Sequence, residues 1–285
     1  MRPMSLNFEA PSALEHFRCL VREDLDLPLL EAAASLALDA EPALDLQDVL
    51  FQVDSLAARL RSALPQGASA LQRTVVLNEF FYDKLGFGVN ANDFADPANS
   101  FVHRVLATRK GIPISLAVLW LELATAIGLK AQGISFPGHF LIKVHVDEGL
   151  IIQDPLTGRG LTQDALQERL EPFREGWGLA QDEMAPLHLF LVPASGREIL
   201  ERMLRNLQTI HAQAEDAPQL LAVLHRLIVL RPQEYSHYRD RGLVLAQLGQ
   251  RDAALQDLQT YVRHAPAPQD LPLIEARIEL LRAEP

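Results

Sequence analysis

Three side chains in the middle of the chain have the types needed for nucleophilic attack on an amide or an ester. His139 follows a Pro-Gly turn, Asp154 precedes a proline, and Ser115 lies in the run RKGIPISLA. An imidazole acts as a general base when a carboxylate holds its other ring nitrogen, and it can then activate a hydroxyl or a thiol. We therefore predict a candidate catalytic set of His139, Asp154 and Ser115.

The nucleophile of this set is the open question. Cys19 is the single cysteine, and its place beside Leu20 and Val21 in an amphipathic helix predicts a buried thiol that packs as a small hydrophobic group. Ser115 lies two residues beyond Pro113 on a helix, so the two side chains point about 200° apart. Ser115 therefore does not inherit the face that Pro113 presents.

The pairing of His139 with Asp154 depends on the register of a β-hairpin. A turn centred on residues 148–149 places Asp154 opposite Lys143. Direct contact with His139 then requires a bulge or a wider turn, and the alternative is an edge histidine bonded to a backbone carbonyl. A metal site is not expected, because His145 lies six residues away along the strand, too far for one tetrahedral site.

A second group of polar residues precedes the most apolar helix, in the run DPANSFVHRVLATRKG. The candidates for ligand binding are Asn99, Ser100, His103 and Arg109 in this run, and Pro113 just after it. In the structural alternative, Asn99 or Ser100 caps a helix while His103 and Arg109 hold the loop in place. The pair Asp96-Pro97 fits a turn.

Helical segments come before these residues and around them. Apolar residues recur at helical spacing from Ala13 to Leu64, and again from Ala70 to Leu85 before a glycine. Gly, Asn and Asp fill residues 86–100, which predicts a long ordered loop. A helix over 100–108 follows, and then an almost wholly apolar core helix over 113–128.

After residue 128 the apolar period changes to two. Strands are predicted over 130–134, 139–146 and 150–154, with another over 187–192. Helices followed by an antiparallel sheet indicate an α+β domain. The pattern beyond Pro193 is helical to the end, so we expect two domains, 1–193 and 194–285.

The C-terminal domain contains an internal repeat. Large, small and proline residues fall at the offsets of the tetratricopeptide pattern: Tyr238, Gly242, Leu245, Gly249, Ala254, Leu258 and Pro266. Pro232 lies one repeat before Pro266, and the earlier unit is degenerate. This predicts an all-α domain of about five helices over 196–282, stacked as a short solenoid against the first domain.

The run GIPISLAVLWLELATAIGL resembles the core helix of transglutaminase-like cysteine enzymes, which have a papain-like core. In that superfamily a cysteine begins the helix, and a histidine and an aspartate on the following strands complete the triad. Alignment on Gly111 and Ala117 puts Pro113 at the cysteine position. The resemblance implies a transglutaminase-like fold that keeps His139 and Asp154 but lacks the thiol.

Longer motifs resemble the bacterial SirB family, an invasion-regulator group. They include NANDFADPANSFVHRVLATRKGIPISLAVLW, ISFPGHFLIKV, DPLTGR, REILERMLRNL and YRDRGLVLAQLG. The resemblance covers nearly the whole chain, and members generally carry the G-I-P-I-S-L run where the enzymes carry their cysteine. It implies a transglutaminase-like domain followed by tetratricopeptide repeats, and a regulatory role.

Charge and composition exclude several classes of partner. Lys and Arg number 26 against 37 Asp and Glu, a net charge of −11, which argues against a nucleic-acid backbone as partner. One cysteine excludes an internal disulfide framework and a multi-cysteine metal site. The start shows no signal-peptide run, and the apolar stretch 114–129 is too short to cross a membrane. We expect a soluble cytoplasmic protein with no cofactor, no metal, and no nucleic-acid or membrane partner.

Two functions of different classes fit these residues. In the first, a pseudoenzyme binds a peptide or a side-chain amide in a cleft near His139 and Asp154, and the repeats recruit a protein partner of unknown identity. In the second, an amide or ester hydrolase uses the same two residues with a nucleophile such as Ser115. We predict the first, a regulatory binding and scaffold module.

Overall fold

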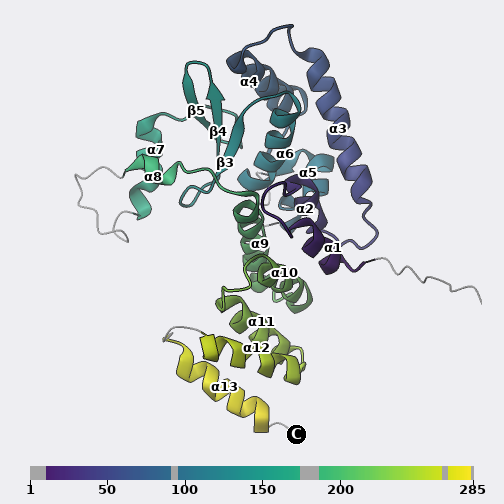
Figure 1. The fold of residues 1–285 in the computed structure, drawn as a ribbon, viewed down its shortest axis with the longest axis vertical. Helices are drawn as coiled ribbons and strands as arrows, with labels where there is room; N and C mark the ends of the chain where they lie inside the picture. The colour runs from purple at the N-terminus through teal and green to yellow at the C-terminus, as the bar shows by residue number, and fades with distance from the viewer. Residues whose placement is uncertain (1–10, 91–95, 174–185, 265–268, 284–285) are drawn as a thin grey trace, which may run out of the picture.

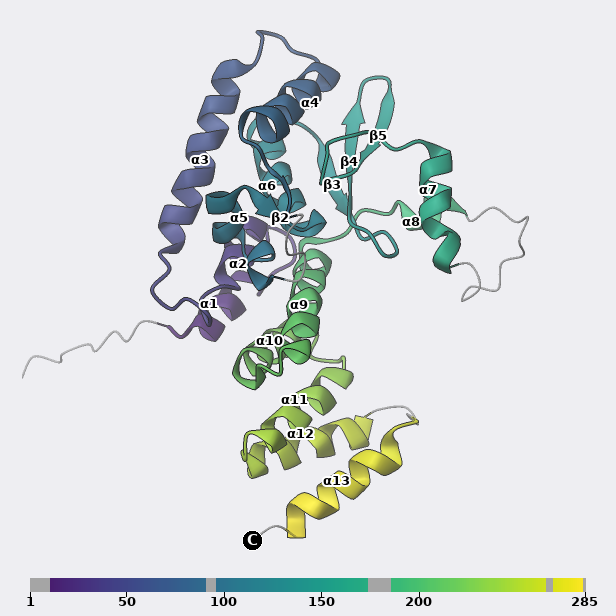
Figure 2. The ribbon, with the colours of Figure 1, turned by 180° about the vertical axis from the view of Figure 1, so that it is seen from behind.

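The computed structural model describes residues 11–90, 96–173, 186–264 and 269–283. In the first part of the chain, helices pack around a small antiparallel sheet, and the second part continues as a stack of helices (Figure 1). The view from behind agrees that the last helix, α13 (Leu271–Ala283), lies farthest from the sheet (Figure 2).

Four helices come first, as the helical periodicity predicts: α1 (Ala13–Leu20), α2 (Leu29–Ser35), α3 (Leu46–Ala63) and α4 (Ala70–Asn78). Their starts are set by local side chains, since the hydroxyls of Ser12 and Ser69 accept hydrogen bonds from backbone N–H groups of the first turns of α1 and α4. Helix α4 passes directly into a π-helical turn, η1 (Glu79–Lys84). The helical run ends before Gly86, whose φ of +74° is left-handed.

The next segment leads to the core helix. A short strand β1 (Gly88–Val89) pairs in parallel with β2 (Lys110–Gly111), and the 3-10 turn η2 (Pro97–Asn99) and α5 (Val102–Thr108) lie between them. Residues 91–95 of the predicted loop lie outside the described residues. Helix α6 (Pro113–Ala126) is buried along most of its length, as its apolarity predicts.

Three antiparallel strands follow in the order β3 (Ala131–Ile134), β4 (Leu141–Val146) and β5 (Gly149–Gln153). The predicted hairpin register is wrong by two residues. Val146 pairs with Gly149, so Asp147 and Glu148 form a two-residue turn, and Lys143 pairs with Ile152. The turn therefore lies one residue earlier than predicted, and Gly149, whose φ of +140° favours glycine, begins β5 and is not part of the turn.

The predicted strand over 187–192 is also wrong. After α7 (Gln163–Leu170) and the 3-10 turn η3 (Glu171–Phe173), the chain forms a short helix, α8 (Leu187–Phe190). Leu187, Phe190 and Leu191 are spaced as on one helix face, and all three pack against a small apolar cluster between the sheet and α7. The alternating pattern was therefore a helix face and not a strand.

Beyond residue 195 the described part of the chain forms five helices, in agreement with the repeat pattern: α9 (Gly196–Gln213), α10 (Ala217–Leu230), α11 (Ser236–Gln247), α12 (Arg251–His264) and α13. Gly242 allows α11 and α12 to approach, since a Cβ atom there would lie 2.8 Å from the side chain of Leu258. Pro266 of the repeat pattern lies outside the described residues.

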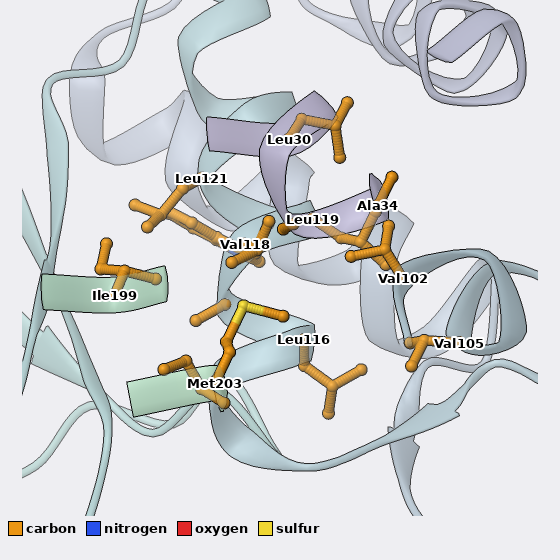
Figure 3. Packing of buried hydrophobic residues seen from close by; sticks show 14 of the residues in the cluster. Leu30, Ala34, Val102, Val105, Leu116, Val118, Leu119, Leu121, Ile199 and Met203 are labelled. Atoms are coloured by element: carbon orange, nitrogen blue, oxygen red, sulfur yellow. The ribbon is translucent and has the colours of Figure 1, made fainter. Parts of the chain in front are cut away.

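The first repeat helices share the core of the preceding domain. Ile199 and Met203 of α9 pack against Leu116 and Val118 of α6 (Figure 3), and the same buried cluster extends through α10 to Val244 of α11. A separate cluster joins α11 to α12 and α13. The domain division at residue 193 stays a prediction, but the apolar packing continues across it.

An ion pair reinforces this junction. Arg226 of α10 is almost wholly buried, and it donates to the carboxylate of Asp39, which follows α2. The guanidinium also lies over the ring of Phe17 in α1. The first repeat is therefore attached to the N-terminal helices by both apolar packing and charge.

Candidate functional site

A pocket of about 330 Å³ lies where the start of α6, the turn before β4 and residues 202–210 of α9 meet. Residues 112–114 and 138–140 form two of its walls, and Arg202, Asn206, Thr209 and Ile210 of α9 form the third. The structure thus brings Pro113 and His139 into one cavity. It also brings α9, which the sequence assigns to the repeats, into the same site.

Pro113 is the first residue of α6. Proline is favoured there because it has no N–H to leave unbonded and its φ angle already fits a helix. The preceding residue, Ile112, provides no side-chain cap for the first turn. The position that the sequence alignment gives to a thiol is therefore filled by a saturated ring that offers neither a nucleophile nor a proton.

His139 is half-buried in the pocket, just before β4. Its backbone N–H donates to the carbonyl of Phe136 at 3.0 Å, while its ring forms no hydrogen bond within the described part of the chain. Burial lowers the pKa of His139, the positive charges of Arg169 and Arg202 lower it further, and Asp154 opposes them. The ring is therefore neutral near pH 7 and free to bond a ligand.

Asp154 follows β5 but does not orient His139 by a hydrogen bond. Its Oδ2 accepts from Arg169 Nη2 at 2.8 Å, and its Oδ1 accepts from the backbone N–H of Leu156 at 2.9 Å. The predicted base and acid pairing is thus replaced by an ion pair with α7. Arg169 was missed by the sequence analysis, because no local pattern marks a partner that comes from a separate helix.

Arg202 is the second residue that the sequence analysis missed. Its Nη1 donates to Ser135 Oγ at 2.9 Å and to the carbonyl of Phe136 at 3.0 Å, and its guanidinium lies over the ring of Phe140. Burial lowers its pKa, yet a guanidinium stays protonated in proteins. The run REILERMLRNL contains this residue, but its helical spacing indicated only a repeat helix.

Ser115 is fully buried and engaged in holding the loop to α6. Its Oγ donates to the carbonyl of Asn99 at 2.6 Å and accepts from the N–H of Ile112 at 3.1 Å. It is not among the residues that line the pocket beside His139. This placement gives Ser115 a structural role and leaves His139 without a serine partner.

The other candidate ligand residues lie away from this pocket. Asn99 and Ser100 are buried, and neither caps α5, because Phe101 occupies the N-cap position. The predicted cap is therefore displaced by one or two residues toward the C-terminus. Asp96 and Pro97 begin a turn as expected, with the Asp96 carboxylate accepting from the N–H of Ala98.

His103 and Arg109 hold the loop in place, as the structural alternative predicts. The Nε2 atom of His103 lies 3.0 Å from the carboxylate of Glu41, which ties α5 to the segment after α2. Arg109 ends α5 in a left-handed conformation with φ of 61°, and its guanidinium stacks over the ring of Phe87. Of the five predicted ligand residues, only Pro113 lines the pocket.

Cys19 is exposed in the last turn of α1, and not buried as its apolar neighbours suggested. The short helix turns Phe17 fully inward and leaves Cys19, two residues on, facing outward. Cys19 is also absent from the lining of the pocket. In the described ranges, no three His, Cys, Asp or Glu side chains gather as metal ligands would.

Comparison with known proteins agrees with this arrangement. The family described as "Transglutaminase-like superfamily" matches residues 47–205, and a tetratricopeptide repeat family matches residues 207–279. A UPF0162 protein of Xylella fastidiosa strain Temecula1 is 36% identical, covering 90% of each chain. This chain belongs to the UPF0162 family, within the transglutaminase-like superfamily.

Other UPF0162 proteins are similar over most of their length. One from Pseudomonas aeruginosa is 31% identical, covering 85% of each chain, and the protein YchA of Escherichia coli K12 is 25% identical, covering 83% of this chain and 85% of its own. No solved structure matches the chain. The predicted fold, a transglutaminase-like α+β domain followed by all-α tetratricopeptide repeats, is confirmed.

The repeats of this UPF0162 protein carry a second, larger groove. A cavity of about 700 Å³ lies between α9, α10 and α11, and Gln208 of α9 donates across it to Asp240 of α11 at 3.2 Å. Tetratricopeptide repeats in general form surfaces for contact with other proteins. Among the described helices, none is both long enough and apolar enough to cross a membrane.

Proposed function

We propose that this UPF0162 protein is a non-catalytic regulatory module that binds a ligand in the pocket beside His139 and a protein partner through its repeats. The observation that carries the proposal is Pro113, which stands in the pocket where an enzyme of this superfamily would need its thiol. The resemblance to the SirB family supports a regulatory role, and the single cysteine supports a place in the reducing cytoplasm.

The states of the other candidate residues support the same proposal. Asp154 is held by Arg169, and the hydroxyl of Ser115 is held by Asn99. In a triad the nucleophile is hydrogen-bonded to the base, and the base is hydrogen-bonded to the orienting group. Neither contact of such a triad is present in the described part of the chain, so binding is the function that these residues favour.

A kinetic assay tests the absence of catalysis. The full chain is incubated with p-nitrophenyl acetate and with a glutamine-containing peptide amide, beside the variants His139→Ala and His145→Ala. We expect all three proteins to release product at the same background rate. Turnover by the wild type that His139→Ala abolishes and His145→Ala retains would establish the hydrolase instead.

A second experiment tests the scaffold role of the repeats. Ala212 lines the groove between α9, α10 and α11 and is exposed, while Ala276 on α13 is exposed and outside the groove. Proteins captured from a bacterial extract by the full chain are compared with those captured by Ala212→Arg and Ala276→Arg. We expect one specific protein to be lost only with Ala212→Arg, and retention by both variants would contradict a partner in the groove.

A further inference from the structure

The pocket beside His139 is positively charged in character, although the chain as a whole carries a net charge of −11. In the described part of the chain, no carboxylate lines it, whereas Arg202 does. The Arg202 Nε and Nη2 groups form no hydrogen bond within the described ranges, so donors of a charged group stay available. The nearby Asp154 is already paired with Arg169.

Helix α6 adds to this positive character. It is 14 residues long and begins at the pocket wall. The Ile112 side chain has no acceptor for the N–H groups of the first turn, and the Ser115 hydroxyl accepts only from the N–H of Ile112, the residue before the helix. The unbonded N–H groups of a first turn and the helix dipole favour an anion. Asn206 and Thr209, on the facing wall, provide neutral polar groups that can complete the coordination of an oxygen.

The rest of the lining is apolar. Ile112 and Ile114 flank Pro113 on one wall, and Phe140 and Ile210 face it from the others. A volume of about 330 Å³ is at the small end of ligand pockets, which suits one amino-acid residue or a short acyl chain better than an extended peptide. The pocket therefore combines an anion end with an apolar body.

We propose that this pocket binds an apolar carboxylate, with Arg202 and the start of α6 holding the carboxylate group and the isoleucines and Phe140 enclosing the apolar part. The carboxylate can belong to the C-terminal residue of a peptide or to a free short-chain acid, which share this chemistry. The inference rests on the proposed function, because it assigns a ligand to the same pocket.

Calorimetric titration of the full chain tests the ligand chemistry. The probes are N-acetyl-leucine, which imitates a peptide C-terminus, and hexanoate, each beside its uncharged amide. A charge-assisted hydrogen bond to a guanidinium predicts at least about tenfold tighter binding of the acid than of its amide. The tighter of the two acids identifies the source, and equal binding of acids and amides would overturn the carboxylate assignment.

Three variants test whether the acid binds in the pocket beside His139. Arg202→Gln should weaken the acid at least about tenfold and leave the amide unchanged, whereas Arg205→Gln, on the next turn of α9 and exposed outside the pocket, should change neither. Thr209→Trp fills the pocket from an exposed position and should abolish binding of both forms without removing a buried group. It serves as the test if Arg202→Gln does not fold.

The possible failures are distinguishable. If neither acid binds, or if Thr209→Trp binds as the wild type does, the ligand assignment is wrong while the non-catalytic role can still stand. If the wild type hydrolyses an ester or an amide in a His139-dependent manner, the proposed function is wrong, whatever the titrations give.

Discussion

The buried hydroxyl of Ser115 donates a 2.6 Å hydrogen bond to the backbone carbonyl of Asn99, 16 residues earlier in the chain. The same oxygen accepts from the N–H of Ile112, just before α6. One side chain therefore fixes the end of the loop and the start of the core helix together. This contact also fixes Pro113 at the wall of the pocket, because Pro113 directly follows Ile112 as the first residue of α6.

Ser115→Ala should lower the free energy of unfolding by about 1 kcal/mol. The buried carbonyl of Asn99 and the N–H of Ile112 each lose their bond to the hydroxyl and keep only their 3.3 Å bond to each other. Urea denaturation followed by circular dichroism measures the change. Ser62→Ala is the matched control: Ser62 is exposed on α3 and bonds only a carbonyl of its own helix, so its loss should cost about 0.5 kcal/mol or less. Unchanged stability in Ser115→Ala would show that the bond is unimportant.

Asp39→Ala should destabilise the protein by on the order of 3 kcal/mol, because the almost wholly buried guanidinium of Arg226 then lacks its counter-charge. Asp24→Ala also removes an ion pair between a repeat helix and the N-terminal segment, to Arg197. The Asp24 side chain is 70% exposed, so about 1 kcal/mol or less is expected. Equal losses in the two variants, measured by urea denaturation, would contradict the importance of burial.

The pH dependence of stability should reveal the protonation of His237 of α11 on unfolding. This side chain is 1% exposed, and neither ring nitrogen has a hydrogen-bond partner among the described residues. Burial lowers its pKa and the positive charge of Arg205 lowers it further, against the carboxylates of Glu234, Asp240 and Glu201. Below pH 6.5 the unfolded chain therefore binds a proton that the folded chain does not, and stability falls as the pH falls.

His237→Leu removes this contribution, so its unfolding free energy should decline less steeply than that of the wild type between pH 7 and pH 5. His139, His211 and His225 also have pKa values lowered mainly by burial and leave a remaining slope of the same sign. His188→Leu, at an exposed position, is the control. The same slope in the wild type and in His237→Leu would exclude His237 as the cause.

Elements that depend on local sequence were predictable. The start of α6 at Pro113 and its burial follow from proline at the first turn and from continuous apolarity. The five repeat helices follow from the spacing of residues such as Gly242. In both cases the relevant interactions lie within a few residues, or recur at a fixed period.

Features set by distant partners were not predictable. The ion pair of Asp154 with Arg169 and the bonds of Arg202 to residues 135–136 join separate elements, and no periodicity encodes them. The hairpin register and the helix α8 were also not predicted. In both places the local alternation of apolar and polar residues fits the predicted and the observed structure equally well. The structure therefore differs from the sequence prediction more in the residues that line the pocket than in the fold.

The shared packing of α6 with α9 and α10 has a consequence for synthesis on the ribosome. Helix α6 ends at Ala126, but the buried cluster to which it belongs extends to Val244 of α11. About 120 further residues must be added before that core can close, which takes roughly 6–24 s at about 5–20 residues per second. The nascent N-terminal helices therefore wait with an uncovered apolar face, and during that interval the emerging chain is most exposed to aggregation or to capture by chaperones.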